Sequence, residues 1–299
     1  MSKHGETERQ IISKFKSESV FTFENTCFKI LEIGKPKPSK GECKTDVYIL
    51  AKNISTNVKR EFKISIKQSD ADFLENKISL ERAIEILGAD AQKIIYNSIL
   101  SVEKSFNDDF LVYFDKFKRT EGKCIKIGWK FEFINKSGGE RSGLMLLDDS
   151  QKIDIYSGSN LNQSKKDSLV NGVVIKNSGV ANYILEVENT TENLKYFLDK
   201  LLPIEEFAVK QDIYFACKAV NYRATFNKWD GNRSLSVYVQ WTLEGEEIKA
   251  ELIMNNPLEV KANIIGENIQ GILNGLSIDS DNFEELKKYL SKEVNVYPK

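Results

Sequence analysis

The run EFKISIK, which ends at Lys67, alternates apolar and polar side chains and predicts a half-buried β-strand. Successive side chains of a strand point to opposite faces, so Phe62, Ile64 and Ile66 form a core face and the residues between them form a polar face. The preceding run TDVYILAKN is a second strand, and the short connection predicts an antiparallel pair. The terminal lysine is either the solvated end of an ordinary strand or a functional group placed there.

Helices are predicted on both sides of this strand pair. Apolar residues at helical spacing predict an opening helix within residues 6–19. After the pair, Ser69 is a candidate N-cap with Asp72 three residues later, and the helix is expected to end near Gly88.

A further helical region is expected at about 90–116, and strands dominate after it. The expected strands include CIKIGWKFEFI, KIDIYSG, GVANYILEVE, DIYFACKAVNYR, LSVYVQWTL and EIKAELIM, with short helices at ENLKYFLDKLL and NFEELKKYLSKE. The predicted fold class is therefore mixed α/β, with a strand-rich C-terminal half. We expect a catalytic core in residues 1–120 and a strand-rich part in residues 121–299, which completes the sheet and recognises the substrate; the two form either separate domains or one continuous domain.

Composition narrows the possible chemistry. The only histidine is His4, which excludes Ser/His/Asp and Cys/His triads and histidine-rich metal sites. Four cysteines without CxxC spacing indicate neither a zinc site nor a disulfide framework. No apolar run approaches a membrane span and the N-terminus lacks a signal-peptide pattern, so we expect a cytoplasmic protein without membrane contact. Catalysis would rest on carboxylates, lysines and a hard metal ion.

Carboxylates suited to such an ion flank the strand pair. Asp46 begins the first strand, and Lys67 at the end of the second could orient a water. A second acidic ligand is expected two residues before the lysine, but Ser65 occupies that position. On the wheel of the following helix, Glu81 falls within the apolar arc whereas Glu75 falls on the polar side. A buried carboxylate needs a cation or hydrogen-bond partners, so Glu81 is the preferred second ligand.

The series Asp46, Ser65-Ile66-Lys67 and Glu81 resembles the D…SxK…E variant of the PD-(D/E)xK nucleases, known from type II restriction endonucleases. The resemblance covers residues 1–120 and implies a restriction-endonuclease-like core, a mixed central sheet flanked by helices. It implies that Asp46 and Glu81 bind Mg²⁺, that the Ile66 carbonyl completes the site and that Lys67 assists the attacking water. The chain departs from the pattern in having Lys44-Thr45 where a proline is usual.

Two alternatives for the site remain open. Glu61-Phe62-Lys63 is a literal ExK, although its lysine would sit mid-strand, and Glu75 could replace Glu81 as ligand. For function, the resemblance implies an Mg²⁺-dependent endonuclease cleaving double-stranded DNA, most simply a type II restriction enzyme. Such an enzyme leaves 5′-phosphates, acts as a homodimer or higher oligomer and has a companion DNA methyltransferase. The alternatives are a DNA- or protein-binding protein with an inactivated core, or a repair or defence nuclease without sequence specificity.

Two loops are candidates for DNA contact. The net charge of −1 means that phosphate binding must come from a local patch. The first loop offers lysines for phosphates, and the second, around the turn WDGNR, offers groups that read base edges. The first set is Lys35, Lys37, Lys40 and Lys44; the second is Arg223, Asn227, Lys228, Trp229, Asn232 and Arg233. A solvated lysine loop and an exposed hairpin tip are the corresponding structural readings.

Overall fold

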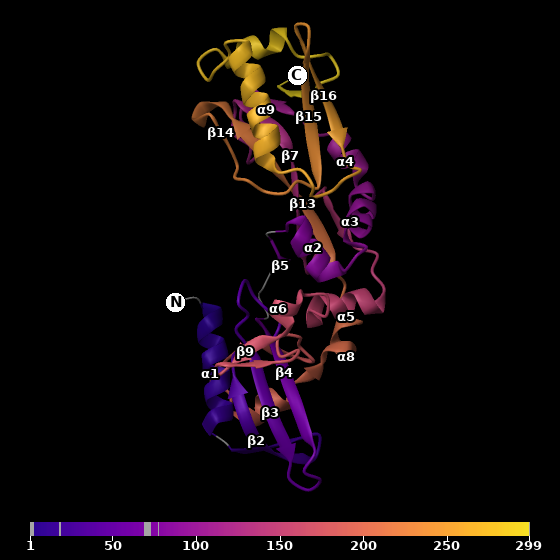
Figure 1. Cartoon of the computed structure of the whole chain (residues 1–299). Helices are drawn as coiled ribbons and strands as arrows, with labels where there is room; N and C mark the ends of the chain where they lie inside the picture. The colour runs from indigo at the N-terminus through magenta and orange to yellow at the C-terminus, as the bar shows by residue number, and fades with distance from the viewer. Residues whose placement is uncertain (1–2, 18, 69–72, 77, 299) are drawn as a thin grey trace. The chain divides into compact units, whose positions relative to one another are not determined.

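The computed structural model describes residues 3–17, 19–68, 73–76 and 78–298, and the chain forms two compact units (Figure 1). The first comprises Met1–Ala71, Glu85–Gly88 and Leu147–Gln211; the second comprises Asp72–Ile84, Ala89–Leu146 and Asp212–Lys299. Because the units interleave along the chain, neither coincides with residues 1–120, and the division into catalytic and recognition parts stays a prediction. Among the described residues, no helix is long and apolar enough to cross a membrane.

The first unit is built on one mixed sheet of order β1-β2-β3-β4-β11-β12. Its strands are β1 (Val20–Phe23), β2 (Thr26–Gly34), β3 (Val47–Asn53), β4 (Lys59–Gln68), β11 (Tyr183–Val187) and β12 (Leu202–Pro203). Strands β1 to β4 are antiparallel neighbours, as predicted for β3 and β4, and β11 runs parallel to β4. The predicted mixed α/β class is confirmed.

Helices α1 (Lys3–Ser17) and α7 (Leu194–Asp199) contribute to the core on one face of this sheet. Figure 1 shows α1 running beside β2. Ile11 and Phe15 lie one helical turn apart on α1 and are buried with Phe62 and Ile64 of β4, so the predicted opening helix and core face are both confirmed.

The opposite face of the sheet is covered as well. Three residues, Tyr48, Ser65 and Ile184, point to this face, and each is at most 2% exposed. Helix α8 (Ile204–Ala208) contacts β11, and α5 (Asp149–Ser157) packs against α8. The face that alternation predicted to be wholly polar is therefore not open to solvent at Ser65, because α/β packing buries both sides of the strand.

A small hairpin completes the first unit. It consists of β9 (Ser168–Val170) and β10 (Val173–Ile175), which follow the short helix α6 (Gln163–Lys166). Asn171 and Gly172 form its two-residue turn with positive φ angles of 49° and 87°, as a type I′ turn requires. Leu169 forms a bridge with Lys37, which fastens the hairpin beside the end of β2.

The second unit holds a sheet with β7 (Cys124–Ile134) at its centre and α9 (Ala262–Gly275) packed against it. The sheet also contains β5 (Phe73–Glu75), β6 (Val112–Tyr113), β8 (Ser142–Leu144), β13 (Tyr214–Arg223), β14 (Lys228–Trp229), β15 (Val237–Glu244), β16 (Glu247–Ile253) and β17 (Val296–Tyr297). The other helices that lie wholly in this unit are α3 (Ala91–Leu100), α4 (Glu103–Asn107), η1 (Ala224–Phe226) and η2 (Phe283–Lys288). Figure 1 shows α9 lying along β15.

Two local predictions were wrong and one helix was missed. The helix expected to begin at Ser69 is replaced by β5, paired with β7, and by a shorter helix α2 (Leu80–Leu87); Ser69 and Asp72 lie outside the described residues. The run KIDIYSG belongs to helix α5, because Asp148 and Gln151 form a capping box and Gly158 ends the helix with φ of 78°. Helix α9 was not predicted.

Candidate active site

Asp46 directly precedes β3 and lies against the C-terminal part of β4. Its backbone N–H donates to the carbonyl of Ile64 at 2.8 Å, and its Oδ2 accepts from the N–H of Ile66 at 2.7 Å. The N–H and C=O of one strand residue point to the same edge, so the Ile66 carbonyl also faces the β3 side. The predicted proximity of Asp46 to the Ile66 peptide is thus present within the first unit.

The electrostatic surroundings of Asp46 are unusual for a carboxylate. Burial raises the pKa of Asp46 to about 6, and the Glu8 carboxylate raises it further. The Ile66 N–H, Lys67 and Lys35 act in the opposite direction and lower the pKa. The pKa of this half-buried carboxylate stays raised despite two lysines, so nearby positive charge does not fully offset the cost of burying the ionised form. We call such a carboxylate under-compensated, and it gains most from an added cation.

Lys67 lies near Asp46, as its effect on the Asp46 pKa indicates. Its side chain is half-buried, and within the described part of the chain it forms neither a hydrogen bond nor an ion pair. In the parallel register of β4 with β11, Lys67 pairs with Glu186, an exposed carboxylate. The ammonium group is therefore available to a substrate or a water.

Glu8 is a member of this cluster that sequence reasoning missed. It lies on α1, its side chain is only 14% exposed and it forms an ion pair with Lys35. A signal for it exists in the sequence, since on a helical wheel Glu8 falls about 20° from the buried Phe15. Glu81 was chosen because a carboxylate on the apolar arc of a helix should be buried and need a partner. Glu8 meets both conditions, since it is largely buried and pairs with Lys35.

Glu81 does not occupy the predicted buried position. It is exposed in the first turn of α2, where its own N–H and the hydroxyl of Ser79 lower its pKa. The wheel failed because it assumed a longer helix. In α2, Ala83 and Ile86 are buried, whereas Ile84 is 44% exposed. Glu81 belongs to the second unit and Asp46 and Lys67 to the first, so their convergence stays a prediction.

The two alternative carboxylates have partners of their own. Glu61 Oε1 accepts from the Tyr48 hydroxyl at 2.6 Å and lies four residues before Ser65, about 13 Å along the strand. Glu75 lies on β5, also in the second unit, and pairs with Arg82 at 2.7 Å. The position predicted for Glu75 on a helix was wrong. Neither residue approaches Asp46 within one unit.

No protein-family model, curated protein or solved structure matches the chain.

The lysines of the first predicted DNA-contact loop differ in their surroundings. Lys35 and Lys37 line one groove with Arg9 and Lys16 of α1, whereas Lys40 is exposed outside it. Lys44 is half-buried, and its side chain packs against Gly158. The loop is thus only partly a solvated lysine loop.

The turn around WDGNR is largely occupied by contacts within the second unit. Arg223 pairs with Asp230 at 2.6 Å and with Glu121. The amide oxygen of Asn227 accepts hydrogen bonds from the side chains of Tyr222 and Gln270. The amide oxygen of Asn232 accepts one from the backbone N–H of Asn263. The Trp229 ring packs on Gly266. Of the six predicted readers, only Lys228 and Arg233 present exposed charges without an ion pair among the described residues.

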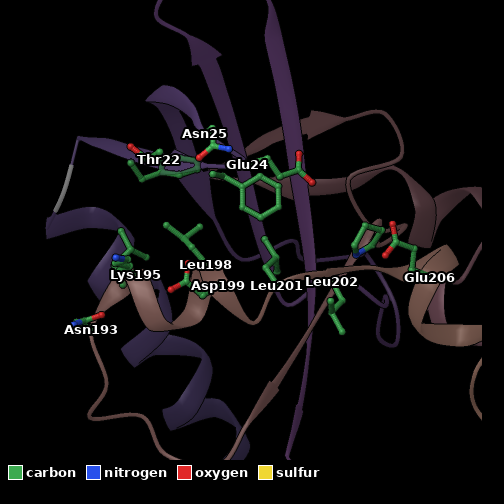
Figure 2. A pocket seen from close by; sticks show the side chains of 14 residues that line it. Thr22, Glu24, Asn25, Asn193, Lys195, Leu198, Asp199, Leu201, Leu202 and Glu206 are labelled. Atoms are coloured by element: carbon green, nitrogen blue, oxygen red, sulfur yellow. The ribbon is translucent and has the colours of Figure 1, made fainter.

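A pocket of about 980 Å³ in the first unit lies away from the Asp46 cluster (Figure 2). It adjoins the β1–β2 turn, which the strand registers place at the opposite end of the sheet from Asp46. Glu24, Asp199 and Glu206 outnumber Lys195 among its charged side chains, which Figure 2 labels. This charge balance disfavours a phosphate ligand, so the pocket is not a candidate for nucleic-acid chemistry.

Proposed function

We propose that this chain is an Mg²⁺-dependent endonuclease that hydrolyses phosphodiester bonds of double-stranded DNA, with its active site at the end of β4. The observation that carries the proposal is the half-buried, under-compensated Asp46 carboxylate beside Lys67 and the Ile66 peptide. The order of an opening helix, antiparallel strands and a parallel strand after β4 supports the mixed sheet flanked by helices that the motif resemblance implies.

The residues present fit a hard divalent cation. Asp46, Glu8 and the Ile66 carbonyl offer two carboxylates and a peptide oxygen, the donor types that Mg²⁺ takes while keeping several waters. Among the described residues no group of three His, Cys, Asp or Glu side chains suits a metal ion, so an all-protein cage is not offered. Glu8 is the second carboxylate in this proposal, because it lies in the same unit as Asp46 and its charge acts on Asp46; Glu81 is the alternative.

The roles of the protein groups follow from their chemistry. A bound Mg²⁺ ion would neutralise charge on the scissile phosphate and lower the pKa of a bound water. Lys67 would donate a hydrogen bond to the attacking water and favour its deprotonated form. Asp46 is held in place by the Ile66 N–H, and its Oδ1, which has no hydrogen-bond partner in the described part of the chain, would bind the cation.

Within this class we favour a sequence-specific type II restriction enzyme. This entails a homodimer or higher oligomer, a companion methyltransferase, products with 5′-phosphates and action in the cytoplasm. The second unit would read the sequence, with Lys228 and Arg233 as its exposed cations. A repair or defence nuclease would use the same site without a reading surface.

One observation favours a second candidate, a binding protein with an inactivated core. Ser65 stands where the motif ordinarily supplies a carboxylate, and it is only 2% exposed, so its hydroxyl cannot substitute for an open acidic ligand. In that case the Asp46 cluster would persist without supporting hydrolysis.

The test is plasmid cleavage by the purified full chain with Mg²⁺, compared with EDTA. Asp46→Asn, Lys67→Met and Glu8→Gln are expected to abolish cleavage, whereas Asp199→Asn, an exposed carboxylate of the same unit, should cut normally. Discrete fragments indicate a restriction enzyme and a smear indicates a nuclease without sequence specificity. Intact DNA with retained binding would establish the inactivated core instead.

The same experiment decides the ligand assignment. If Glu8→Gln cuts normally and Glu81→Gln does not, the second acidic ligand comes from α2 and the role of Glu8 is only to neutralise Lys35.

A further inference from the structure

A groove of about 550 Å³ lies in the first unit among α1, the end of β2 and the β9–β10 hairpin. Its charged lining residues are all cations: Arg9, Lys16, Lys35 and Lys37. The remaining lining residues are apolar or neutral, so among the described residues no carboxylate belongs to the lining. This balance is opposite to that of the pocket in Figure 2 and marks the groove as a site for a polyanion.

Most of these cations form no ion pair within the described part of the chain. Arg9, Lys16 and Lys37 are exposed, and among the described residues none of them has an ion-pair partner. Lys35 alone is paired, with Glu8. Three cations are therefore free to release their counterions when a phosphate chain binds, and this release drives binding to nucleic acids.

The walls of the groove are held in position before any ligand binds. The backbone N–H and C=O of Lys37 are both bonded to Leu169, at 2.9 and 3.0 Å. Asn171 Nδ2 donates to the carbonyl of Ile33 at 3.0 Å. A Cβ at Gly34 would approach Asn171 Oδ1 to 2.8 Å, so glycine is what allows the hairpin to close on β2. These contacts fix the backbone of the groove, so binding orders less of the chain than it would on an unstructured loop.

The hairpin adds exposed apolar side chains near the cations. Val173 and Val174 of β10 are 61% and 62% exposed and, as neighbours in one strand, point to opposite faces of the two-stranded ribbon. A ribbon with exposed apolar side chains beside cations matches a duplex, because sugars and base edges lie between its charged phosphates. An acidic peptide would offer no such repeating arrangement.

The groove also leads to the candidate active site. Lys35 lines the groove and forms an ion pair with Glu8, and Gly34 of the groove pairs in register with Tyr48 of β3, two residues after Asp46. We infer that this groove, through Arg9, Lys16 and Lys37, holds the phosphate backbone of duplex DNA and directs it to Asp46 and Lys67. The choice of DNA rests on the proposed function, whereas binding of the backbone does not require catalysis.

The test measures DNA binding separately from cleavage. The full chain carrying Asp46→Asn is titrated into a fluorescein-labelled 30-bp duplex, and anisotropy gives the affinity between 50 and 200 mM KCl. The groove variant adds Arg9→Glu, Lys16→Glu and Lys37→Glu. The matched control adds Lys29→Glu, Lys59→Glu and Lys195→Glu, which reverse three exposed lysines of the same unit outside the groove.

Loss of three phosphate contacts should make the slope of log K against log salt shallower by about 3, and should weaken binding at 50 mM KCl by at least tenfold. The control should keep the slope and affinity of the parent. Equal behaviour of the groove variant and the control, or no DNA binding by the parent, would overturn the inference. Tighter binding of an RNA duplex than of the DNA duplex would overturn the choice of DNA.

Failure of this inference is distinguishable from failure of the proposed function. The groove and control changes are also made in the wild-type chain, and plasmid cleavage is measured. If the groove variant cuts as well as the control, the groove is not the path of the substrate although the nuclease stands. If no variant cuts but the groove variant alone loses binding, the groove stands and the nuclease does not.

Discussion

Replacing Asp46 by asparagine removes a carboxylate that the first unit holds partly out of water. Burial and the Glu8 carboxylate raise the pKa of Asp46 from its ordinary value of 3.8 to about 6. With a raised pKa the folded protein binds this proton more tightly than the unfolded chain does. The ionised group therefore destabilises the folded protein above about pH 6, and this cost disappears as the pH falls toward 4.

The magnitude follows from the shift. A change of about two pKa units at about 1.4 kcal/mol each sets a ceiling of about 3 kcal/mol. Because the side chain is only half-buried, solvent screening reduces the expected cost to about 1–2 kcal/mol. Asp46→Asn should thus be more stable than the parent by about 1–2 kcal/mol at pH 8, with no difference at pH 4. Active-site groups are often kept at a cost in stability. A protein that becomes more stable when the Asp46 carboxylate is removed therefore behaves as expected for a functional residue.

The assay must report on the first unit by itself. All three tryptophans, Trp129, Trp229 and Trp241, belong to the second unit, so their fluorescence does not follow β3 and β4. We would titrate with urea in EDTA at both pH values and read the unfolding of peptides covering β3 and β4 by pulsed hydrogen exchange at a common labelling pH. Tryptophan fluorescence of the same samples serves as an internal control and should not change.

Two further conditions sharpen the test. Asp199→Asn, the exposed control, should leave stability unchanged at both pH values. Mg²⁺ at about ten times its dissociation constant should stabilise the parent by about 1.4 kcal/mol at pH 8 and should not stabilise Asp46→Asn. An Asp46→Asn protein that is less stable than the parent at pH 8, or a difference independent of pH, would refute the assignment of Asp46 as an under-compensated carboxylate.

Other changes probe the scaffold and the cluster. Phe62→Ala removes a buried ring that contacts four other aromatic rings at 5.4–5.5 Å, and should cost about 3–5 kcal/mol in urea unfolding of the first unit. Asp148→Ala removes the N-cap of α5, should cost about 1 kcal/mol and should speed hydrogen exchange in that helix. Glu8→Gln should lower the pKa of Asp46 and Lys67→Met should raise it, as measured by carboxyl NMR; shifts in the opposite direction would contradict the proposed cluster.

Sequence patterns predicted well those elements that pair with a segment close in the sequence, or whose apolar residues recur with a clear period. Strand β4 follows a strict period of two, and β3 lies next to it after a short connection, so both pairing and orientation were predictable. Its parallel partner β11 lies more than 110 residues later, and a single sequence gives no register for such a pair. The carboxylate Glu186, which that register places beside Lys67, was therefore not found.

The wrong elements had specific physical causes. At β5, pairing with β7 overrode a helical pattern, and the partner strand is some 60 residues away. In α5, apolar residues at alternate positions suggested a strand. The capping box of Asp148 and Gln151, also present in the sequence, favours a helix more strongly than this short alternation favours a strand. In α9, interior glycines disfavour a helix; Gly266 is nevertheless needed, because a Cβ there would meet the Trp229 ring at 2.6 Å.

The two glutamates considered as ligands show where the sequence argument holds and where it fails. A carboxylate on an apolar helical arc is a sound criterion, since such a group needs compensation when it is buried. It failed for Glu81 because the arc was drawn on a longer helix, whereas Phe73–Glu75 form β5 and helix α2 covers only Leu80–Leu87. It holds for Glu8, because α1 is helical over Lys3–Ser17 and places Glu8 on the same face as Phe15, with only 14% of the Glu8 side chain exposed. The criterion therefore depends on the bounds of the helix, and the opening helix of this chain was the safer place to apply it.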